Sequence, residues 1–110
     1  MVEALVQKGV VVTVVDNLKR GQIRHLDAVR DGIIFRQEDL ADLRVCEKAC
    51  QGQEVVLHLA SDAYGLSYSH AHHSEIMTNN LRLNANMLDA CAKNDVKRLL
   101  TISSSCVYLR

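Results

Sequence analysis

Apolar and polar positions along the chain follow two alternating patterns, one with helical spacing and one typical of buried strands. Val2, Leu5 and Val6 repeat at helical spacing and stop before Gly9, a natural C′ residue. The β-branched run 10–15 that follows is typical of a strand buried on both faces. The same patterns predict further strands over 33–36, 55–60 and 98–103, a weak helix around 25–30, a helix between 42 and 52, and a long helix over 74–94.

The order of these elements predicts a fold class. Asp42 is a suitable N-cap for the helix that follows it, and Gly52 a suitable terminator. Helices that alternate with short apolar strands are typical of a parallel sheet with helices on its faces. The chain has 110 residues, which is room for one domain. We therefore predict a single α/β domain.

Composition narrows the class of protein. The 13 basic and 13 acidic residues balance, which leaves no electrostatic footprint for nucleic acid. No apolar run approaches the ~18 residues of a membrane span, and residues 1–8 look like amphipathic helix rather than a signal peptide. Cys46, Cys50 and Cys91 fit the pattern of buried thiols in a reducing compartment. We expect a cytoplasmic protein without a nucleic-acid or membrane partner.

Candidate binding residues follow the strands. In an open parallel sheet, ligands bind beyond the carboxyl ends of the strands. Asp16 comes directly after the run 10–15, where a carboxylate can accept hydrogen bonds from both ribose hydroxyls of an adenosine. A loop or capping acid is the structural alternative for this residue. Asp39, Ser61 and Ser104 follow the later strands and are expected on the same rim.

Several segments together resemble a known family. They are "VEALVQKGVVVTVVDNLKRG", "EDLADL", "VVLHLAS", "NNLRLNANMLDAC" and "VKRLLTISSSCVY", in this order and spacing. Over essentially the whole chain they resemble the NAD-dependent epimerase/dehydratases, which are extended short-chain dehydrogenase/reductases. "HHSEIMTNN" and "SSSCVY" look most like the GDP-mannose 3,5-epimerase-like branch. The resemblance implies a partial Rossmann-type, doubly wound parallel sheet with NAD as the cofactor.

By position, the resemblance implies cofactor contacts at three strand ends and on the long helix. The resemblance implies that Asp16 binds the adenosine ribose and that Asp39 lies beside the adenine. Asp16 repels a 2′-phosphate, which favours NAD over NADP although Lys19 and Arg20 are close in sequence. The resemblance implies that Asn79 contacts NAD. The alternative is that its side chain forms a hydrogen bond to a neighbouring loop. The predicted cofactor set is Asp16, Asn17, Leu18, Asp39, Leu40, Leu59, Ala60, Ser61 and Asn79.

The resemblance also implies catalytic and substrate contacts. Ser104 is implied to form a hydrogen bond with the sugar hydroxyl that is oxidised. Cys106 is implied to act as an acid/base in proton exchange. Gly65 and Ser105 are placed on the substrate. Serines 103–105 could instead end a strand through backbone hydrogen bonds, and Cys106 could be a buried thiol. The histidines of the loop around 70–73 fit no metal motif, so we predict no metal site.

Two motifs of this family are missing from the sequence. The glycines form no GxxGxxG cluster, which in the family holds the pyrophosphate at a helix N-terminus. None of the three tyrosines is followed four residues later by lysine. We expect residues 1–110 to form one incomplete NAD-binding domain that begins inside the first helix and lacks the first, central strand. The strands predicted at 10–15 and 55–60 are then expected to pair directly; the alternative is a split sheet whose exposed apolar edges invite association.

The leading interpretation is a fragment of an NAD-dependent nucleotide-sugar epimerase or dehydratase, inactive as an isolated chain. The parent enzyme, an isomerase or dehydratase implied to be a homodimer, would transiently transfer hydride from a sugar hydroxyl of its nucleotide-sugar substrate. One alternative is a family oxidoreductase with another substrate, such as a steroid or flavonoid. The other is a non-catalytic, truncated module that binds adenine nucleotides weakly or associates with partners.

Overall fold

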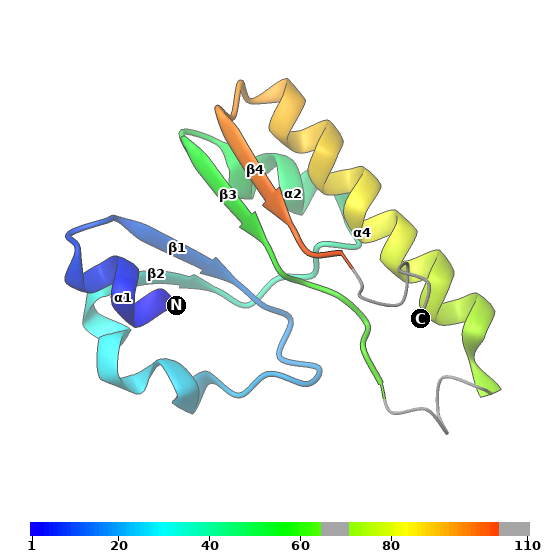
Figure 1. Cartoon of the computed structure of the whole chain (residues 1–110), viewed down its shortest axis with the longest axis horizontal. Helices are drawn as coiled ribbons and strands as arrows, with labels where there is room; N and C mark the ends of the chain where they lie inside the picture. The colour runs from blue at the N-terminus through cyan, green and yellow to red at the C-terminus, as the bar shows by residue number, and fades with distance from the viewer. Residues whose placement is uncertain (65–70, 104–110) are drawn as a thin grey trace, which may run out of the picture.

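The computed structural model describes residues 1–64 and 71–103, and the predicted elements occur there in the predicted order. The weak helix is a 3-10 helix, η1, and the strands are shorter than expected. The elements (Figure 1) are α1 (Val2–Gln7), β1 (Val12–Val15), η1 (Ile23–Gly32), β2 (Ile33–Arg36), α2 (Leu43–Cys50), β3 (Val55–His58), α4 (His73–Lys93) and β4 (Arg98–Thr101).

The ends of the short helices follow from local sequence. Gly9, with a φ of 74°, closes α1: its N–H donates to Val6 O (2.9 Å) and the next N–H donates to Leu5 O (3.1 Å). The Asp42 carboxylate accepts from the backbone N–H of Arg44 (2.8 Å) and so caps α2. Both predicted boundary residues are therefore confirmed.

The strands form two separate parallel pairs. β1 pairs with β2, so that Val12 lies opposite Ile33, and β3 pairs with β4, so that Val55 lies opposite Arg98. In Figure 1 all four arrows run toward the same end of the molecule, where the two sheets converge. The parallel α/β architecture is thus confirmed.

The predicted direct pairing of the strands 10–15 and 55–60 is wrong. Within the described chain β1 pairs only with β2, and β3 pairs only with β4. A cavity of about 680 Å³ separates β1 from β3 and is lined by residues of both strands. We call the part of this cavity between residues 12–15 and 55–58 the inter-sheet slot.

The helical layer explains why the slot stays open. Leu40, Cys50, Leu83 and Met87, all from the buried core, also line the cavity. Drawing β1 onto β3 would compress the core beneath them, and overpacking of this kind is destabilising.

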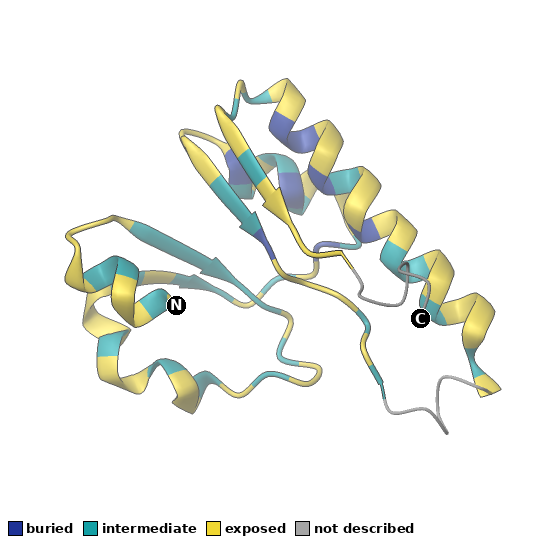
Figure 2. Cartoon of the chain, viewed as in Figure 1, coloured by how far each residue is buried: buried dark blue, intermediate teal, exposed yellow. Residues whose placement is uncertain are grey.

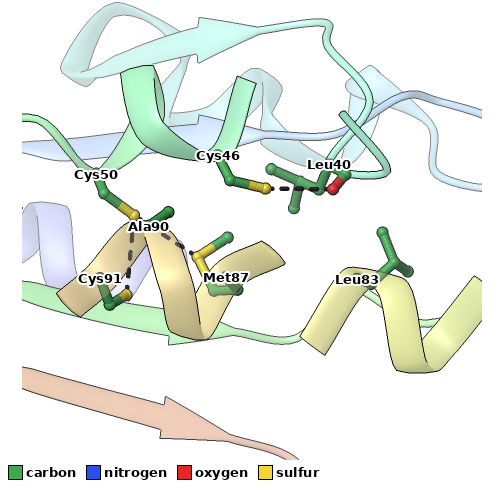
Figure 3. Packing of buried hydrophobic residues seen from close by; sticks show 7 residues of the cluster. All are labelled: Leu40, Cys46, Cys50, Leu83, Met87, Ala90 and Cys91. Atoms are coloured by element: carbon green, nitrogen blue, oxygen red, sulfur yellow. Dashed lines mark hydrogen bonds between the residues drawn. The ribbon is translucent and has the colours of Figure 1, made fainter. Parts of the chain in front are cut away.

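The core is small and lies between α2 and α4 (Figure 3). Val15, Val56 and Leu99 of the strands pack against it. In Figure 2 the buried positions gather on α2, α4 and the end of β3, while α1 and η1 have none. In the part of the chain that the structure describes, the buried apolar residues are Leu40, Cys46, Cys50, Leu83, Met87, Ala90 and Cys91.

The expectation that the run 10–15 is buried on both faces is also wrong. Val11 is 81% exposed and Val10 47%, and β1 itself is only half-buried. The cause is the open slot beside β1, which leaves one edge of the strand without a neighbour among the described residues.

Candidate functional site

The carboxyl ends of β1, β2 and β3 meet the first half of α4 around one cavity. Its volume is about 450 Å³. Charged and amide side chains dominate its walls, and both signs of charge are present. The lining residues are Asn17, Lys19, Asp39, Asp62, Ser74, Glu75, Thr78, Asn79 and Arg82.

The predicted cofactor residues come together here. All except Leu18 line the cavity of about 680 Å³, which continues from the inter-sheet slot to the same rim. The side chains that the two cavities share include Asn17, Asp39 and Asn79. The residues brought together are Asp16, Asn17, Asp39, Leu40, Leu59, Ala60, Ser61 and Asn79.

Asp16 is held in a tight turn. Its Oδ1 accepts a hydrogen bond from the backbone N–H of Leu18 at 2.7 Å, and Leu18 takes a left-handed φ of 57°. A Cβ atom at Gly21 would lie 2.7 Å from Asp16 Oδ2. Gly21 therefore allows the chain to pass directly beside the carboxylate. The polar residues around Gly21 indicate only a loop, because this close approach joins residues five apart through folding of the turn.

A hydrogen bond joins the ends of β1 and β2. Asn17 Nδ2 donates to Asp39 Oδ2 at 3.2 Å. The other carboxylate oxygen of Asp39 accepts from the backbone N–H of Ala41 at 2.9 Å. Asn86 of α4 donates to Leu40 O (3.1 Å) and thereby ties the segment after β2 to the long helix. These hydrogen bonds hold the ends of β1 and β2 and the start of the next segment in place around the rim.

Asp62 is a site residue that sequence analysis missed. Asn80 of α4 accepts from its backbone N–H (2.7 Å) and donates to its backbone carbonyl (3.0 Å). Asn79 donates to the Asp62 carboxylate. The two adjacent helix asparagines were the only signal in the sequence. The alternative interpretation of Asn79, a bond to a neighbouring loop, thus describes the contact that the structure shows.

Arg20 and Tyr64 connect the loops after β1 and β3. The Arg20 guanidinium carbon lies 4.9 Å from the centroid of the Tyr64 ring, which is within range of a cation–π interaction. Arg20 also lines the larger cavity. The contact links two loops that border the rim.

The predicted catalytic and substrate residues lie outside the described residues. These are Ser104, Cys106, Gly65 and Ser105. Among residues 1–64 and 71–103, no group of three or more His, Cys, Asp or Glu side chains could hold a metal ion. No helix in the same two ranges is long and apolar enough to cross a membrane.

Burial changes the chemistry of groups beneath the rim. His58 at the end of β3 is 4% exposed, and burial lowers its pKa below the ordinary value. Burial raises the pKa of Cys46 to about 11 and that of Cys50 to about 12. Cys50 Sγ lies 3.8 Å from Cys91 Sγ, as a thiol pair rather than a disulfide. These cysteines pack as small apolar groups, as the sequence predicts.

The fold and this rim define a parallel α/β domain of the Rossmann type, with a polar cavity where such domains bind nucleotides. A model of the NAD dependent epimerase/dehydratase family matches residues 1–109. The chain belongs to this family, whose cofactor is NAD.

Two curated relatives indicate different branches. The chain is 43% identical over 72 residues to GDP-mannose 3,5-epimerase 1 of Oryza sativa subsp. japonica, covering 63% of this chain and 19% of that protein. It is 33% identical over 75 residues to short-chain dehydrogenase/reductase family 42E member 1 of Danio rerio, covering 67% of this chain and 19% of the relative. The chain thus matches about a fifth of the length of these relatives.

A solved structure supports the same family. It is the UDP-N-acetylglucosamine 4-epimerase from Methanobrevibacter ruminantium M1 in complex with UDP-N-acetylmuramic acid. The TM-score is 0.84 at 31% identity, over 97% of this chain and 34% of that one. The described fold is therefore the fold of one part of such enzymes.

Proposed function

We propose that the chain supplies the adenosine side of the NAD site of a nucleotide-sugar epimerase or dehydratase. One observation carries the proposal. Asp16 and Asp39 stand on one rim, and Gly21 keeps the space beside the Asp16 carboxylate free of a side chain. The similarity to a GDP-mannose 3,5-epimerase over 72 residues supports the nucleotide-sugar class of substrate.

The residues present fit an adenosine. The cavity of about 450 Å³ lies in the ~300–1,000 Å³ range of small-molecule sites. The Asp16 carboxylate uses Oδ1 for the Leu18 N–H, and its other oxygen can accept from a ribose hydroxyl. The apolar side chains of Leu40 and Leu59 line the neighbouring cavity and can pack against an adenine ring.

NAD supplies the hydride acceptor when it is bound. In this proposal the described residues bind and orient the nucleotide, and Asp62, clamped by Asn79 and Asn80, fixes the loop beside it. The assignments of Ser104 and Cys106 as catalytic groups, and of Gly65 and Ser105 as substrate contacts, rest on the resemblance. Cytoplasmic location and a homodimeric parent enzyme stay predictions on the same basis.

The isolated chain is proposed to be inactive. A tyrosine with a lysine four residues later removes the hydroxyl proton in this family, and the sequence has no such pair. The chain also has no GxxGxxG cluster to hold the pyrophosphate. We therefore expect weak nucleotide binding and no turnover of GDP-mannose in the presence of NAD.

Nuclear magnetic resonance titration with adenosine monophosphate and with NAD tests the proposal. We expect millimolar affinity, with shift changes confined to 16–21, 39–41 and 59–62. Asp16→Ala and Gly21→Ala should each weaken binding about tenfold, since an interaction with a charged acceptor is lost or displaced. Gln22→Ala changes an exposed neighbour and is the matched control. Micromolar affinity, or shifts that these variants do not affect, would contradict the proposal.

The second candidate is an oxidoreductase of the same family. The similarity to the 42E member of Danio rerio, over 67% of the chain, favours it. Both candidates share the adenosine site, so the titration does not separate them. Appending the missing family segments from a rice GDP-mannose 3,5-epimerase, and assaying epimerisation of GDP-mannose, distinguishes the two.

A further inference from the structure

The loop after β3 is joined to α4 by two adjacent asparagines that bond different parts of one residue. Asn80 accepts a hydrogen bond from the backbone N–H of Asp62 at 2.7 Å and donates to the backbone carbonyl of the same residue at 3.0 Å. Asn79 donates instead to the Asp62 carboxylate. The Asn80 bonds hold the loop through its backbone, so they do not require the carboxylate.

The Asp62 carboxylate determines which way the Asn79 amide is turned. An ionised carboxylate offers hydrogen-bond acceptors only, whereas a carboxamide has a donor NH2 group on one side and an acceptor carbonyl on the other. The NH2 group of Asn79 faces Asp62. The reverse orientation would bring two acceptors together and leave half-buried polar atoms without partners, which is costly. The carbonyl oxygen of Asn79 is thereby kept on the side away from Asp62.

Asn79 lies where the proposed nucleotide site continues from the strand ends to α4. It lines both the polar cavity of about 450 Å³ and the larger cavity, as do Asn17 and Asp39. Adenosine presents hydrogen-bond donors in two places, the amino group of adenine and the ribose hydroxyls. A carbonyl oxygen can accept from either donor and would repel another carbonyl in the same place. An acceptor at position 79 therefore favours a ligand with a donor there.

We propose that Asp62 is a specificity-determining positioning residue, which holds the Asn79 amide so that its carbonyl oxygen accepts a hydrogen bond from a donor group of the nucleotide. Asp62 acts through Asn79 and does not itself have to touch the ligand. The inference rests on the proposed adenosine site and concerns only the pattern of donors and acceptors that this site selects.

Side-chain amide resonances test the orientation of Asn79 without a ligand. In the unmodified chain the NH2 protons of Asn79 should exchange slowly with solvent, because the group is bonded to the Asp62 carboxylate. Asp62→Asn keeps the shape of the side chain and removes its charge, so exchange at Asn79 should become faster while the Asn80 resonances change little. Asp89→Asn removes the same charge from an exposed residue of α4 and is the matched control. Asn79 exchange that Asp62→Asn leaves unchanged would overturn the inference.

Nucleotide analogues test the selectivity by nuclear magnetic resonance titration. Adenosine monophosphate is compared with inosine monophosphate, which has a carbonyl in place of the adenine amino group, and with the 2′-deoxy and 3′-deoxy forms, which each lack one hydroxyl. The analogue without the donor that pairs with Asn79 should bind the unmodified chain about tenfold more weakly. Asp62→Asn should reduce this preference to about twofold or less, because the amide can then turn either way. Asp89→Asn should retain the preference, and the analogue affected identifies the donor as amino group or hydroxyl.

An exchange of the two side chains separates orientation from structural damage. Asp62→Asn combined with Asn79→Asp restores an amide-to-carboxylate hydrogen bond in the reverse direction and leaves an acceptor at position 79. The double variant should therefore regain the preference that Asp62→Asn alone loses. Equal weakening of all four nucleotides by Asp62→Asn, or a double variant without the preference, would overturn the inference alone. Failure of adenosine monophosphate to bind the unmodified chain would overturn the proposed adenosine site, and the inference with it.

Discussion

At the scale of single residues, His58 makes the free energy of unfolding depend on pH. Burial lowers its pKa, while an unfolded histidine titrates near ~6.5. Between these two values the unfolded chain binds more protons than the folded one. The free energy of unfolding should therefore fall as the pH drops below ~6.5 and through the lower pKa of the folded state.

Urea unfolding at about pH 7 and about pH 5 measures this effect. His58→Gln keeps a polar side chain but removes the titration, so the loss of stability on acidification should be smaller than in the unmodified chain. His25→Gln changes an exposed histidine on η1 and should leave the pH dependence as it is. If both variants lose the same stability on acidification, His58 is not the source.

The residues of the rim differ in how far sequence could identify them. Asp16 follows β1 directly and Asp39 lies in the short segment after β2, and the rule that parallel strands present their carboxyl ends to a ligand locates both without coordinates. Asp62 lies in the loop after β3 and is recognisable only through its contacts with α4, and Gly21 is significant only because the turn returns to Asp16. Contacts of this kind depend on how loops fold back, which a strand pattern does not encode.

At the scale of elements, the end of α4 is a strained cap. Asp95 takes a left-handed φ of 53°, and the N–H of Val96 donates to Cys91 O at 3.1 Å. A residue with a Cβ pays a steric penalty in this conformation, and glycine does not. Asp95→Gly should therefore raise the free energy of unfolding by about 0.5–1 kcal/mol.

Chemical denaturation compares this variant with a control on the same helix. Asp89→Gly is exposed within α4, where the backbone is helical, and should lower stability by about 1 kcal/mol. We therefore expect Asp95→Gly to raise the free energy of unfolding and Asp89→Gly to lower it. Destabilisation by Asp95→Gly would show that the cap is not strained.

Element boundaries were predictable where a local signal exists. Gly9 and Asp42 act at the positions that their residue types favour. The short strands and the 3-10 form of η1 were not predictable in detail. The length of a strand depends on its partners, and here each strand has only one among the described residues.

At the scale of the whole molecule, stability is distributed unevenly. Among residues 1–64 and 71–103, the buried apolar side chains lie between positions 40 and 91, and α1 and η1 contribute none. Regions with few buried contacts open more readily than the core. Amide hydrogen exchange should therefore be slowest in α2 and in the second half of α4, and fast in α1.

Mass spectrometry of hydrogen exchange on peptides from the chain can check this order. Peptides from 43–50 and 83–91 should retain deuterium protection longest, and those from 2–7 should lose it first. Equal protection of α1 and α2 would show that both parts unfold as one cooperative unit.

The sequence by itself determined the α/β class, the order of the elements, their caps and the acids at the strand ends, because these depend on local periodicity and residue type. Only the tertiary structure decided that β1 and β3 stay apart, that Asn80 clamps Asp62, and that His58 is buried without a partner among the described residues. These features join positions distant along the chain. They depend on how the folded chain brings these positions together, which a linear pattern does not record.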